Sequence, residues 1–567
     1  MQEISNKLGY FLISYLKSDY FTKLCRLVFM QINIFDSLNK LLSADSLFIP
    51  REMLDRCGRS LTVKALIPIV DVTAVWHPAQ PRVPPMALPW RVEFACGANI
   101  AYPMVIFMDK NSAAAYSIAL TNCIDDCLCS AKMNQELCAY EVVFNIAVTA
   151  KTEPFEIFYN DSHLPMTDLL QLFRNKIMPE VPSYPAAAWE PVYCTWYAVH
   201  AAITGEYLKS NAAEAARLGF GTFIVDDGWC LDEHKRVTPI TLADWYRDIG
   251  DWELSTQKLP DMKEIVTQAQ KLGFSYMFWV APFFAGRRSK LNEKVSCYLT
   301  DLHEGQRIID PADKCAADAV TESILNIFKS MDLDGLKIDF IDAVLPDVQK
   351  PHCRAARKYV EELVGKIRQI KPEALIEFRQ SYATAVNAAL ATAFRAGDVP
   401  FDYVENFNRC VQIRLHMGDG IPVHADPVYF NSAESAETVG RHMIASLAGV
   451  PMLSMELSSI APEHKKVIAN YIGFYKEHQQ TFNYGHWSFD FRNGTTAFAR
   501  CSTPDETVII LVDELLLTRA LQDCRGKVTV LNMSGESLTA SGNIFDAQGN
   551  LSVAGNVPPG GRVETAL

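Results

Sequence analysis

The chain has 567 residues, of which 49% are hydrophobic and 21% are charged, so it is long enough for two or three domains with full cores. Its formal net charge of −13 argues against a nucleic-acid partner, because such proteins usually carry a basic surplus or a basic stripe. No run of 18 or more apolar residues occurs, so the sequence predicts no membrane span and no membrane partner.

The 15 cysteines are odd in number and show neither paired CxxC motifs nor Cys/His ligand spacing. The densest group, Cys123, Cys127 and Cys129, lacks a fourth ligand at a familiar spacing, so we expect buried free thiols and no metal site. A reducing compartment fits this content, and a cytoplasmic location is expected. Met1 to Met30 mixes charges into its apolar residues and lacks a small-residue cleavage site, so no signal peptide is expected.

The first part of the chain predicts a β-rich domain over residues 1–165. Residues 1–60 are not assigned, because Leu8–Phe35 fits one helix or two strands. From residue 60 to residue 158, short β-like runs are bounded by Pro, Asn and Gly, as in Leu61–Ile67, Arg91–Phe94 and Glu141–Val148. Residues 166–188 are expected to be a linker that contains the helix-like segment Thr167–Met178 and then a Pro-rich stretch.

From Trp189 to residue 480, short apolar strands alternate with amphipathic helical patterns, which predicts a (β/α)8 TIM barrel of the α/β class. The alternative is a doubly wound open sheet, which is disfavoured because no Gly-rich phosphate loop follows an early strand. The expected strands are Val192–Trp196, Thr222–Asp226, Phe274–Val280, Gly335–Phe340, Ala374–Phe378, Ala393–Gly397, Ile421–His424 and Pro451–Met455. Helical patterns between them include Tyr207–Leu218, Met262–Lys271, Ala316–Ser330, Arg354–Ile370 and Ala436–Ala448.

After the predicted barrel, residues 481–567 return to short alternating runs that are split by Gly, Asn and Asp. These runs predict a small C-terminal β-sandwich without an obvious catalytic group. They are Thr496–Arg500, Thr507–Val512, Lys527–Asn532 and Leu538–Ile544.

The segment Gly335–Phe340 reads as a buried strand that carries Lys337 and Asp339 two residues apart. Residues i and i+2 of a strand point to the same side, so an ammonium and a carboxylate project together and the Lys would keep the Asp ionised. An ionised, oriented carboxylate is the nucleophile that covalent sugar transfer requires. A structural ion pair at a strand end would have the same pattern.

Polar side chains stand at the end of every predicted barrel strand, where catalytic groups of such barrels lie. There is no HxH pattern and no GxSxG motif, so a metal-dependent hydrolase and a serine hydrolase are poorly supported. Carboxylates with aromatic residues suit glycoside cleavage instead. The vicinal Asp226 and Asp227 could capture sugar hydroxyls, or could form a turn or cap before Gly228.

An ordered set of motifs over residues 190–480 resembles the α-galactosidases of glycoside hydrolase family 36, in the clan shared with families 27 and 31. The matching pieces are Phe223–Trp229, Ile249–Trp252 with Lys258–Pro260, Phe278–Phe283, Ile309–Pro311, Leu336–Phe340 and Phe394–Asp398. The resemblance implies an exo-glycosidase that retains the anomeric configuration, acts on an oligosaccharide or glycoside, and needs no cofactor.

The resemblance also implies roles for individual residues. Asp339 would be the nucleophile and Asp398 the general acid/base. The remaining implied residues would bind the sugar. Asp226 and Asp227 would hold its 4- and 6-hydroxyls, and Trp279 would stack on its apolar face. Lys337 would reach its ring hydroxyls and Arg395 would contact the 2-hydroxyl side, and Trp196, at the end of the first predicted strand, is a further candidate for sugar binding.

The chain departs from its relatives after the fifth predicted strand, where Arg379 stands in place of a Cys-containing Gly/Ser-rich loop. A sugar modified at C2 or C6, an anionic sugar or a longer aglycone contact therefore becomes possible. Related activities stay open: an α-N-acetylgalactosaminidase, a β-L-arabinopyranosidase, a raffinose-synthase-type transglycosidase, or a non-catalytic sugar-binding barrel. The N-terminal β region is also shorter than in relatives, so contacts of a possible homo-oligomer cannot be carried over.

Overall fold

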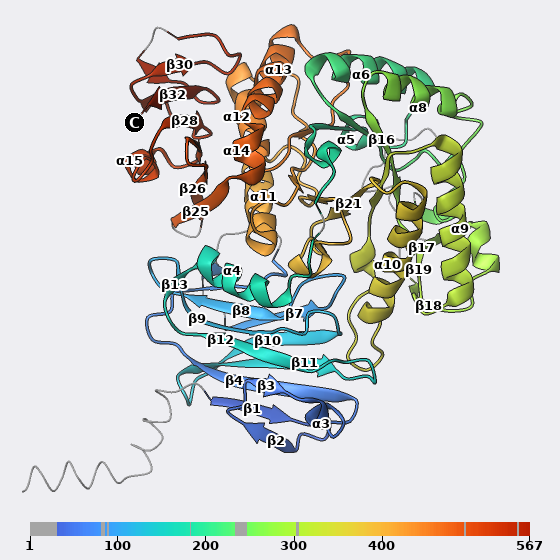
Figure 1. Cartoon of the computed structure of the whole chain (residues 1–567), viewed down its shortest axis with the longest axis vertical. Helices are drawn as coiled ribbons and strands as arrows, with labels where there is room; N and C mark the ends of the chain where they lie inside the picture. Colours follow the sequence, from blue (N-terminus) through green and yellow to red (C-terminus); the bar gives the residue numbers. More distant parts are fainter. Residues whose placement is uncertain are drawn as a thin grey trace, which may run out of the picture.

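The computed structural model describes residues 31–80, 86–87, 90–181, 183–232, 246–301, 306–492, 495–552 and 555–566. Three sheet systems follow one another along the chain: two antiparallel sheets, a parallel barrel ringed by helices, and a C-terminal sheet beside the last barrel helices (Figure 1). The unassigned stretch Leu8–Phe35 lies outside the described residues up to residue 30, and its end forms β1 (Gln31–Phe35).

The N-terminal sheets share one core because their strands alternate buried and half-buried residues. In β4 (Ser60–Pro68), the buried residues are Leu61, Val63, Ala65 and Ile67. One sheet has the order β2 (Leu41–Ala44), β1, β4, β11 (Ala139–Ala147), β10 (Cys127–Asn134), β7 (Arg91–Cys96). The other has the order β3 (Phe48–Ile49), β12 (Phe155–Asn160), β9 (Ala113–Leu120), β8 (Met104–Met108), β5 (Ala74–Trp76), β6 (Met86–Ala87), and β13 (Leu164–Pro165) also pairs with β9.

The eight predicted barrel strands are all present and form one parallel sheet, in which every pair of neighbours except the last strand along the chain and the strand before it is joined by a ladder. Isolated parallel bridges from His424 to Val450 and from Val428 to Leu453 close the ring, so the open doubly wound sheet is wrong. In order around the ring, the strands are β14 (Val192–Cys194), β15 (Thr222–Val225), β16 (Ser275–Val280), β20 (Gly335–Ile338), β21 (Leu375–Arg379), β22 (Ala393–Arg395), β23 (Val423–His424) and β24 (Met452–Leu453).

Helices cover the barrel, and the N-terminal sheets reach it through α4 (Met166–Ile177). Thr204 caps α6 by accepting a hydrogen bond from the N–H of Tyr207, and Asp402 caps α11 through the N–H of Glu405. The barrel helices are α5 (Trp196–Val199), α6 (Gly205–Leu218), α8 (Met262–Lys271), α9 (Lys314–Met331), α10 (Cys353–Ile370), α11 (Tyr403–Met417), α12 (Ala436–Ser446) and α13 (Pro462–Glu477). A small sheet of β17 (Phe284–Gly286), β19 (Gln306–Ile309) and β18 (Tyr298–Asp301) follows β16.

After α14 (Gln479–Tyr484), a six-stranded sheet packs against the barrel helices. The predicted run Leu538–Ile544 is not one strand: it divides into β29 (Leu538–Thr539) and the start of β30 (Asn543–Phe545), which belong to different sheets. The six strands are β25 (His486–Arg492), β26 (Thr495–Ser502), β27 (Glu506–Leu511), β28 (Lys527–Asn532), β32 (Arg562–Ala566) and β30, and β29 pairs with β31 (Asn556–Val557).

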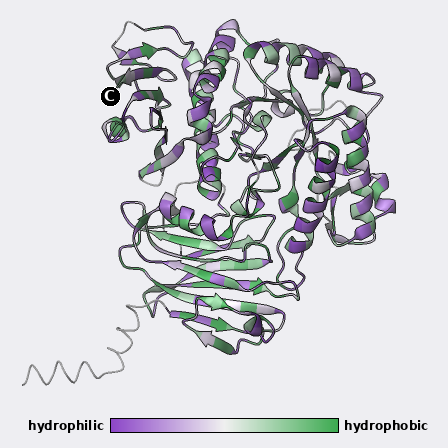
Figure 2. Cartoon of the chain, in the orientation of Figure 1, coloured by the Kyte–Doolittle hydropathy of each residue, from purple (hydrophilic) through white to green (hydrophobic). Residues whose placement is uncertain are grey.

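Hydrophobic residues run along the strands of the N-terminal sheets, whereas the outer helices carry many hydrophilic residues (Figure 2). No helix in the described part of the chain has the length and apolar character needed to cross a bilayer. The domain boundaries after residues 165, 188 and 480 stay predictions.

Candidate functional site

The register of the barrel sheet brings the predicted site residues to one end of the barrel. Trp279 on β16 is the register partner of Lys337 on β20, and Arg379 on β21 is the partner of Arg395 on β22. Asp339 directly follows β20, so its carboxylate lies at the carboxyl end of a central barrel strand. Parallel strands gather their carboxyl ends at one rim, which explains how residues far apart in sequence meet there.

Lys337 forms its ion pair with Asp226, and its charge also helps to keep Asp339 ionised, as the two-residue spacing predicts. Its Nζ lies 2.6 Å from Asp226 Oδ2, and both side chains are almost fully buried. Burial and Arg395 favour the neutral amine, but Asp226, the Cys194 thiol and Asp339 hold the pKa of Lys337 above its ordinary value. The ammonium therefore stays charged and fixes Asp226 at the base of the site.

Asp226 directly precedes a turn at residues 227–230, which agrees with the turn alternative. Its Oδ1 accepts a hydrogen bond of 2.9 Å from the backbone N–H of Asp227, and its Oδ2 accepts one from the Cys194 thiol. Asp226 and Asp227 are 3% and 2% exposed, so the vicinal pair is held inside the rim. Two carboxylates at this depth suit hydrogen bonds from a bound polyol.

Asp339 is held by several donors at once. Its Oδ2 accepts a hydrogen bond of 3.0 Å from the indole N–H of Trp279, and its Oδ1 accepts one of 2.8 Å from the backbone N–H of Phe340. Arg379 Nε lies 3.2 Å from the same Oδ1. Burial would raise the pKa of Asp339, but Arg379, Lys337, Arg395 and the Trp279 N–H hold it well below its ordinary value. The carboxylate is thus ionised and oriented.

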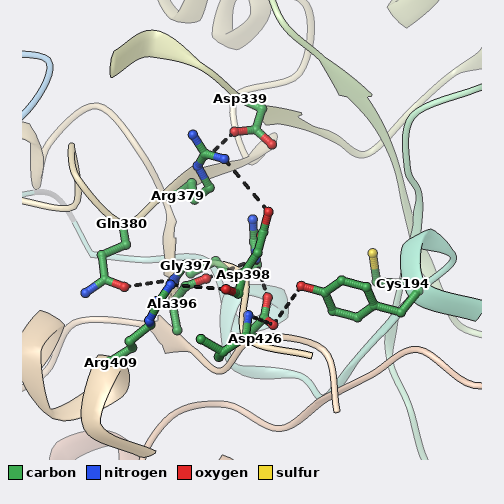
Figure 3. A network of polar contacts seen from close by, with 12 residues as sticks. Cys194, Asp339, Arg379, Gln380, Ala396, Gly397, Asp398, Arg409 and Asp426 are labelled. Atoms are coloured by element: carbon green, nitrogen blue, oxygen red, sulfur yellow. Dashed lines mark hydrogen bonds and ion pairs between the residues drawn. The ribbon is translucent and has the colours of Figure 1, made fainter. Parts of the chain in front are cut away.

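Asp398 lies across the site from Asp339, with Arg379 between them (Figure 3). Arg379 Nη1 is 4.0 Å from Asp398 Oδ2, and Arg395 Nη1 is 3.0 Å from Asp398 Oδ1. The side chain of Asp398 is 46% exposed, whereas that of Asp339 is 6% exposed. Loss of water would raise the pKa of Asp398, but Arg395 and Arg379 together hold it below its ordinary value. The site therefore has one deep and one shallow carboxylate.

The two tryptophans differ in their placement. The Trp279 side chain is buried, with its ring against Trp252 and Phe340 and its N–H bonded to Asp339. Its expected stacking on a sugar face stays a prediction. Trp196 is partly buried at the start of α5, where its ring centroid lies 4.7 Å from that of His200.

Further side chains complete the site, and the candidate list from the sequence lacks them. Asp426 is fully buried and accepts hydrogen bonds from Arg395, from the Val399 N–H and from the Tyr197 hydroxyl. Asp342 pairs with Arg379 at 3.1 Å. Both residues stand near predicted strand ends, and that position is the signal that could have identified them.

A second set of buried polar contacts joins Arg395 to Glu377 and His424. His424 Nδ1 is 3.1 Å from Glu377 Oε2, and Arg395 Nε is 3.5 Å from Glu377 Oε1. Within the described residues, no group of three or more His, Cys, Asp or Glu side chains has an arrangement that could hold a metal ion. The polar groups of the site are thus arranged as carboxylate–arginine and carboxylate–lysine pairs.

A cavity of about 290 Å³ adjoins Asp398. Its walls combine barrel loops with loops of the N-terminal sheets, including Gln380, Ser381, Arg409, Pro78 and Ile100. The residues that line this cavity include Asp398 and Arg379 but not Asp339, so the cavity opens on the side of the shallow carboxylate.

Comparisons with a family model and with curated proteins both find similarity between this chain and α-galactosidases. The Melibiase family model matches residues 157–363. The α-galactosidase AgaA of Geobacillus stearothermophilus is 26% identical over 152 residues, which are 25% of this chain and 20% of the relative. The bifunctional α-galactosidase/sucrose kinase AgaSK of Mediterraneibacter gnavus is 20% identical over 409 residues, which are 68% of this chain and 41% of the relative. The chain thus spans less than half the length of these curated relatives.

Solved structures show the same fold. The galactosidase domain of AgaSK superposes with a TM-score of 0.61 at 15% identity, covering 90% of this chain and 78% of that chain. The family 36 α-galactosidase AgaA from Geobacillus stearothermophilus gives a TM-score of 0.58 at 15% identity, covering 79% of this chain and 67% of that one. By the Melibiase match and the curated relatives, the chain is similar to α-galactosidases, and the solved structures show that it shares the fold of those in glycoside hydrolase family 36.

Proposed function

We propose that the chain is a retaining exo-glycosidase that hydrolyses terminal α-D-galactosides by double displacement. The observation that carries the proposal is the pair Asp339 and Asp398, which face one another through Arg379 at the barrel rim. Related structures of this fold are described in complex with raffinose and with stachyose, which supports an oligosaccharide as the substrate.

In the proposed reaction, Asp339 attacks the anomeric carbon while Asp398 donates a proton to the leaving oxygen. Because Arg395 and Arg379 hold the pKa of Asp398 below its ordinary value in the free protein, this acid role requires that substrate binding raises the pKa of Asp398 and protonates it. Asp339 suits attack because its low pKa keeps it ionised and because the Trp279 and Phe340 N–H groups hold its carboxylate in one orientation. Asp398 then removes a proton from the water that cleaves the covalent galactosyl–Asp339 ester. Asp226, which is paired with Lys337, and the adjacent Asp227 hold sugar hydroxyls.

The test begins with the purified full chain and a panel of p-nitrophenyl glycosides: α-galactoside, α-N-acetylgalactosaminide and β-L-arabinopyranoside. We expect α-galactoside to be the best substrate and the first product seen by NMR to be the α-anomer. A better rate on one of the other glycosides would redirect the assignment to that activity, and transfer of galactose to an added acceptor would indicate a transglycosidase. Turnover of none of them, with retained galactose binding, would leave a sugar-binding barrel.

The variant Asp339→Asn is expected to lower kcat by about 10³-fold or more, because a neutral amide cannot form the covalent ester. Asp334→Asn is the matched control. Asp334 directly precedes β20, at the end of the strand opposite to Asp339, and it pairs with Lys371 at 2.8 Å. The control should retain the activity of the unmodified protein. Circular dichroism on both variants checks their folding. Normal turnover by Asp339→Asn would refute the nucleophile assignment.

A further inference from the structure

Arg379 forms ion pairs with three carboxylates of the site, and Figure 3 shows two of them, those of Asp339 and Asp398. Its Nε is 3.2 Å from Asp339, one Nη is 3.1 Å from Asp342, and the other Nη is 4.0 Å from Asp398. A guanidinium offers five N–H donors in a rigid fork, so a single side chain can serve several acceptors in fixed directions. Among the described residues, Arg379 is the one cation whose ion pairs include both Asp339 and Asp398.

The surroundings of Arg379 hold it in this place. Its guanidinium lies 4.5 Å from the ring centroid of Phe340, which is a cation–π contact, and Asp342 anchors it from the turn after β20. Phe340 and Ser381 have φ angles of 56° and 78°, so the backbone is left-handed immediately after Asp339 and two residues after Arg379. Such conformations cost free energy in residues other than glycine and cluster at functional sites.

The other two cations of the site are committed elsewhere. Lys337 pairs with Asp226 at 2.6 Å, and Arg395 contacts Asp398 together with the buried Asp426. Neither can replace Arg379 between the deep and the shallow carboxylate without giving up its own partner.

We propose that Arg379 is a positioning residue that fixes Asp339 and Asp398 relative to each other and sets the proton affinity of both in the free protein. This inference rests on the proposed glycosidase function. A contact of Arg379 with a modified sugar stays a separate prediction, and the positioning role rests on the three protein carboxylates that share its guanidinium.

Several other charged or titratable groups face the two carboxylates and stay in place when Arg379 is changed. Those around Asp339 are Lys337, Arg395, Asp342, Tyr382 and Tyr246. Those around Asp398 are Arg395, Lys337, Asp426, Tyr197 and Tyr246. Because these groups are common to the variants, a difference between variants reports Arg379 itself.

The direction of the effect follows from charge. A cation within about 4–6 Å lowers the pKa of a carboxyl group by about 1–3 units. Without the cation, both carboxyl groups bind protons more tightly. In a bell-shaped profile of kcat/KM against pH, the acid limb reports the group that must be ionised and the alkaline limb reports the group that must be protonated. Loss of Arg379 should therefore move both limbs to higher pH.

The experiment compares profiles of kcat/KM against pH for the unmodified chain, Arg379→Gln and Arg379→Lys, with an α-galactoside as substrate. We expect Arg379→Gln to shift the alkaline limb upward by about one unit and the acid limb in the same direction. Arg379→Lys keeps the charge and loses the fork, so its limbs should stay near those of the unmodified chain while kcat falls.

Arg357→Gln is the matched control, because this arginine of α10 has a side chain 17% exposed, against 16% for Arg379, and pairs with Glu361. It should leave both limbs in place. The inference would be overturned if the acid and alkaline limbs of Arg379→Gln lay at the same pH as those of the unmodified chain. It would also be overturned if Arg357→Gln shifted the two limbs by as much as Arg379→Gln does. An unmodified chain without glycosidase activity would instead refute the proposed function, so the two failures are distinguishable.

Discussion

At the scale of single residues, the site separates two carboxylates by depth and by partner. Asp339 is buried and accepts hydrogen bonds from the Trp279 and Phe340 N–H groups, whereas Asp398 is half-exposed and contacts only arginines among its ion-pair partners in the described chain. Glycosidases rely on two carboxyl groups in different environments, one as nucleophile and the other as proton donor. In the proposed mechanism the more exposed carboxylate, Asp398, is the one that reaches the leaving group.

Replacement of Asp398 by alanine should therefore depend on the leaving group. We expect Asp398→Ala to slow hydrolysis of an alkyl or sugar α-galactoside by about 10²–10⁴-fold, because protonation of the leaving oxygen is lost. A 2,4-dinitrophenyl leaving group departs without a proton, so its rate of departure should change far less. Steady-state kcat/KM on both substrates measures the difference. An equal loss on both would contradict the acid role.

The sequence placed Asp339, Asp398, Asp226 and Lys337 in one site, because strand ends of a parallel barrel must meet at one rim. It could not give their pairing. The two-residue spacing of Lys337 and Asp339 predicts that both side chains lie on one side of the strand. The ion-pair partner of Lys337 is Asp226, which directly follows β15, and which residues of different strands meet depends on the register of the sheet.

At the scale of elements, the start of α10 is capped from another part of the chain. Asp126, which precedes β10, accepts hydrogen bonds of 3.0 Å from the N–H groups of His352 and Cys353 and one of 2.9 Å from the N–H of Asp347. The first N–H groups of a helix have no partner within it, so a carboxylate there stabilises the helix and its dipole. Asp126 is fully buried, and it joins an N-terminal sheet to a barrel helix.

Asp126→Ala should consequently destabilise the protein by about 2 kcal/mol or somewhat more, since three backbone donors lose their acceptor in a buried place. Urea unfolding monitored by tryptophan fluorescence measures the change. Asp318→Ala is the control, because Asp318 forms an exposed pair with Lys314 on α9 and should change the free energy of unfolding by less than about 1 kcal/mol. Equal effects would show that the buried cap adds nothing.

The periodicity of the sequence located α6, α8, α9, α10 and α12 to within a few residues. The periodicity did not predict α11, because that helix is buried on nearly all sides and its polar residues are not gathered on an exposed face. Its polar residues point into the protein, where partners from other elements bind them: Gln412 binds Trp76, Asn408 binds Thr496, and Arg414 binds the carbonyl of Ala448.

At the scale of the whole molecule, the C-terminal sheet packs closely on α12 and α13. Tyr471 donates a hydrogen bond to the carbonyl of Gly560, and Asn470 donates one to the carbonyl of Ala547. A Cβ on Gly440 of α12 would lie 2.6 Å from the Gly560 oxygen and 2.9 Å from the Cβ of Ala547. The absence of a side chain at residue 440 therefore permits this contact.

Gly440→Ala should lower the thermal midpoint, because backbone and a core side chain would have to move apart at the contact. Gly473→Ala is the matched control on α13, since a Cβ there meets nothing within 4 Å. Alanine in an open helical position should raise the free energy of unfolding by about 0.5–1 kcal/mol. Differential scanning calorimetry should thus show shifts of opposite sign. A rise for both variants would contradict the close approach.

The barrel strands are not hydrogen-bonded to their neighbours to the same extent all the way round the ring. β20, which leads to Asp339, has four register partners on each side, whereas β23 and β24 meet through isolated bridges at His424 and Val428. Asp426 lies in that sparse junction and holds Arg395, which in turn holds Asp398. The deep carboxylate thus follows a strand that is fully paired on both sides, whereas the shallow one depends on a residue at the least paired junction of the ring. A disturbance of that junction is expected to act on Asp398 before it acts on Asp339.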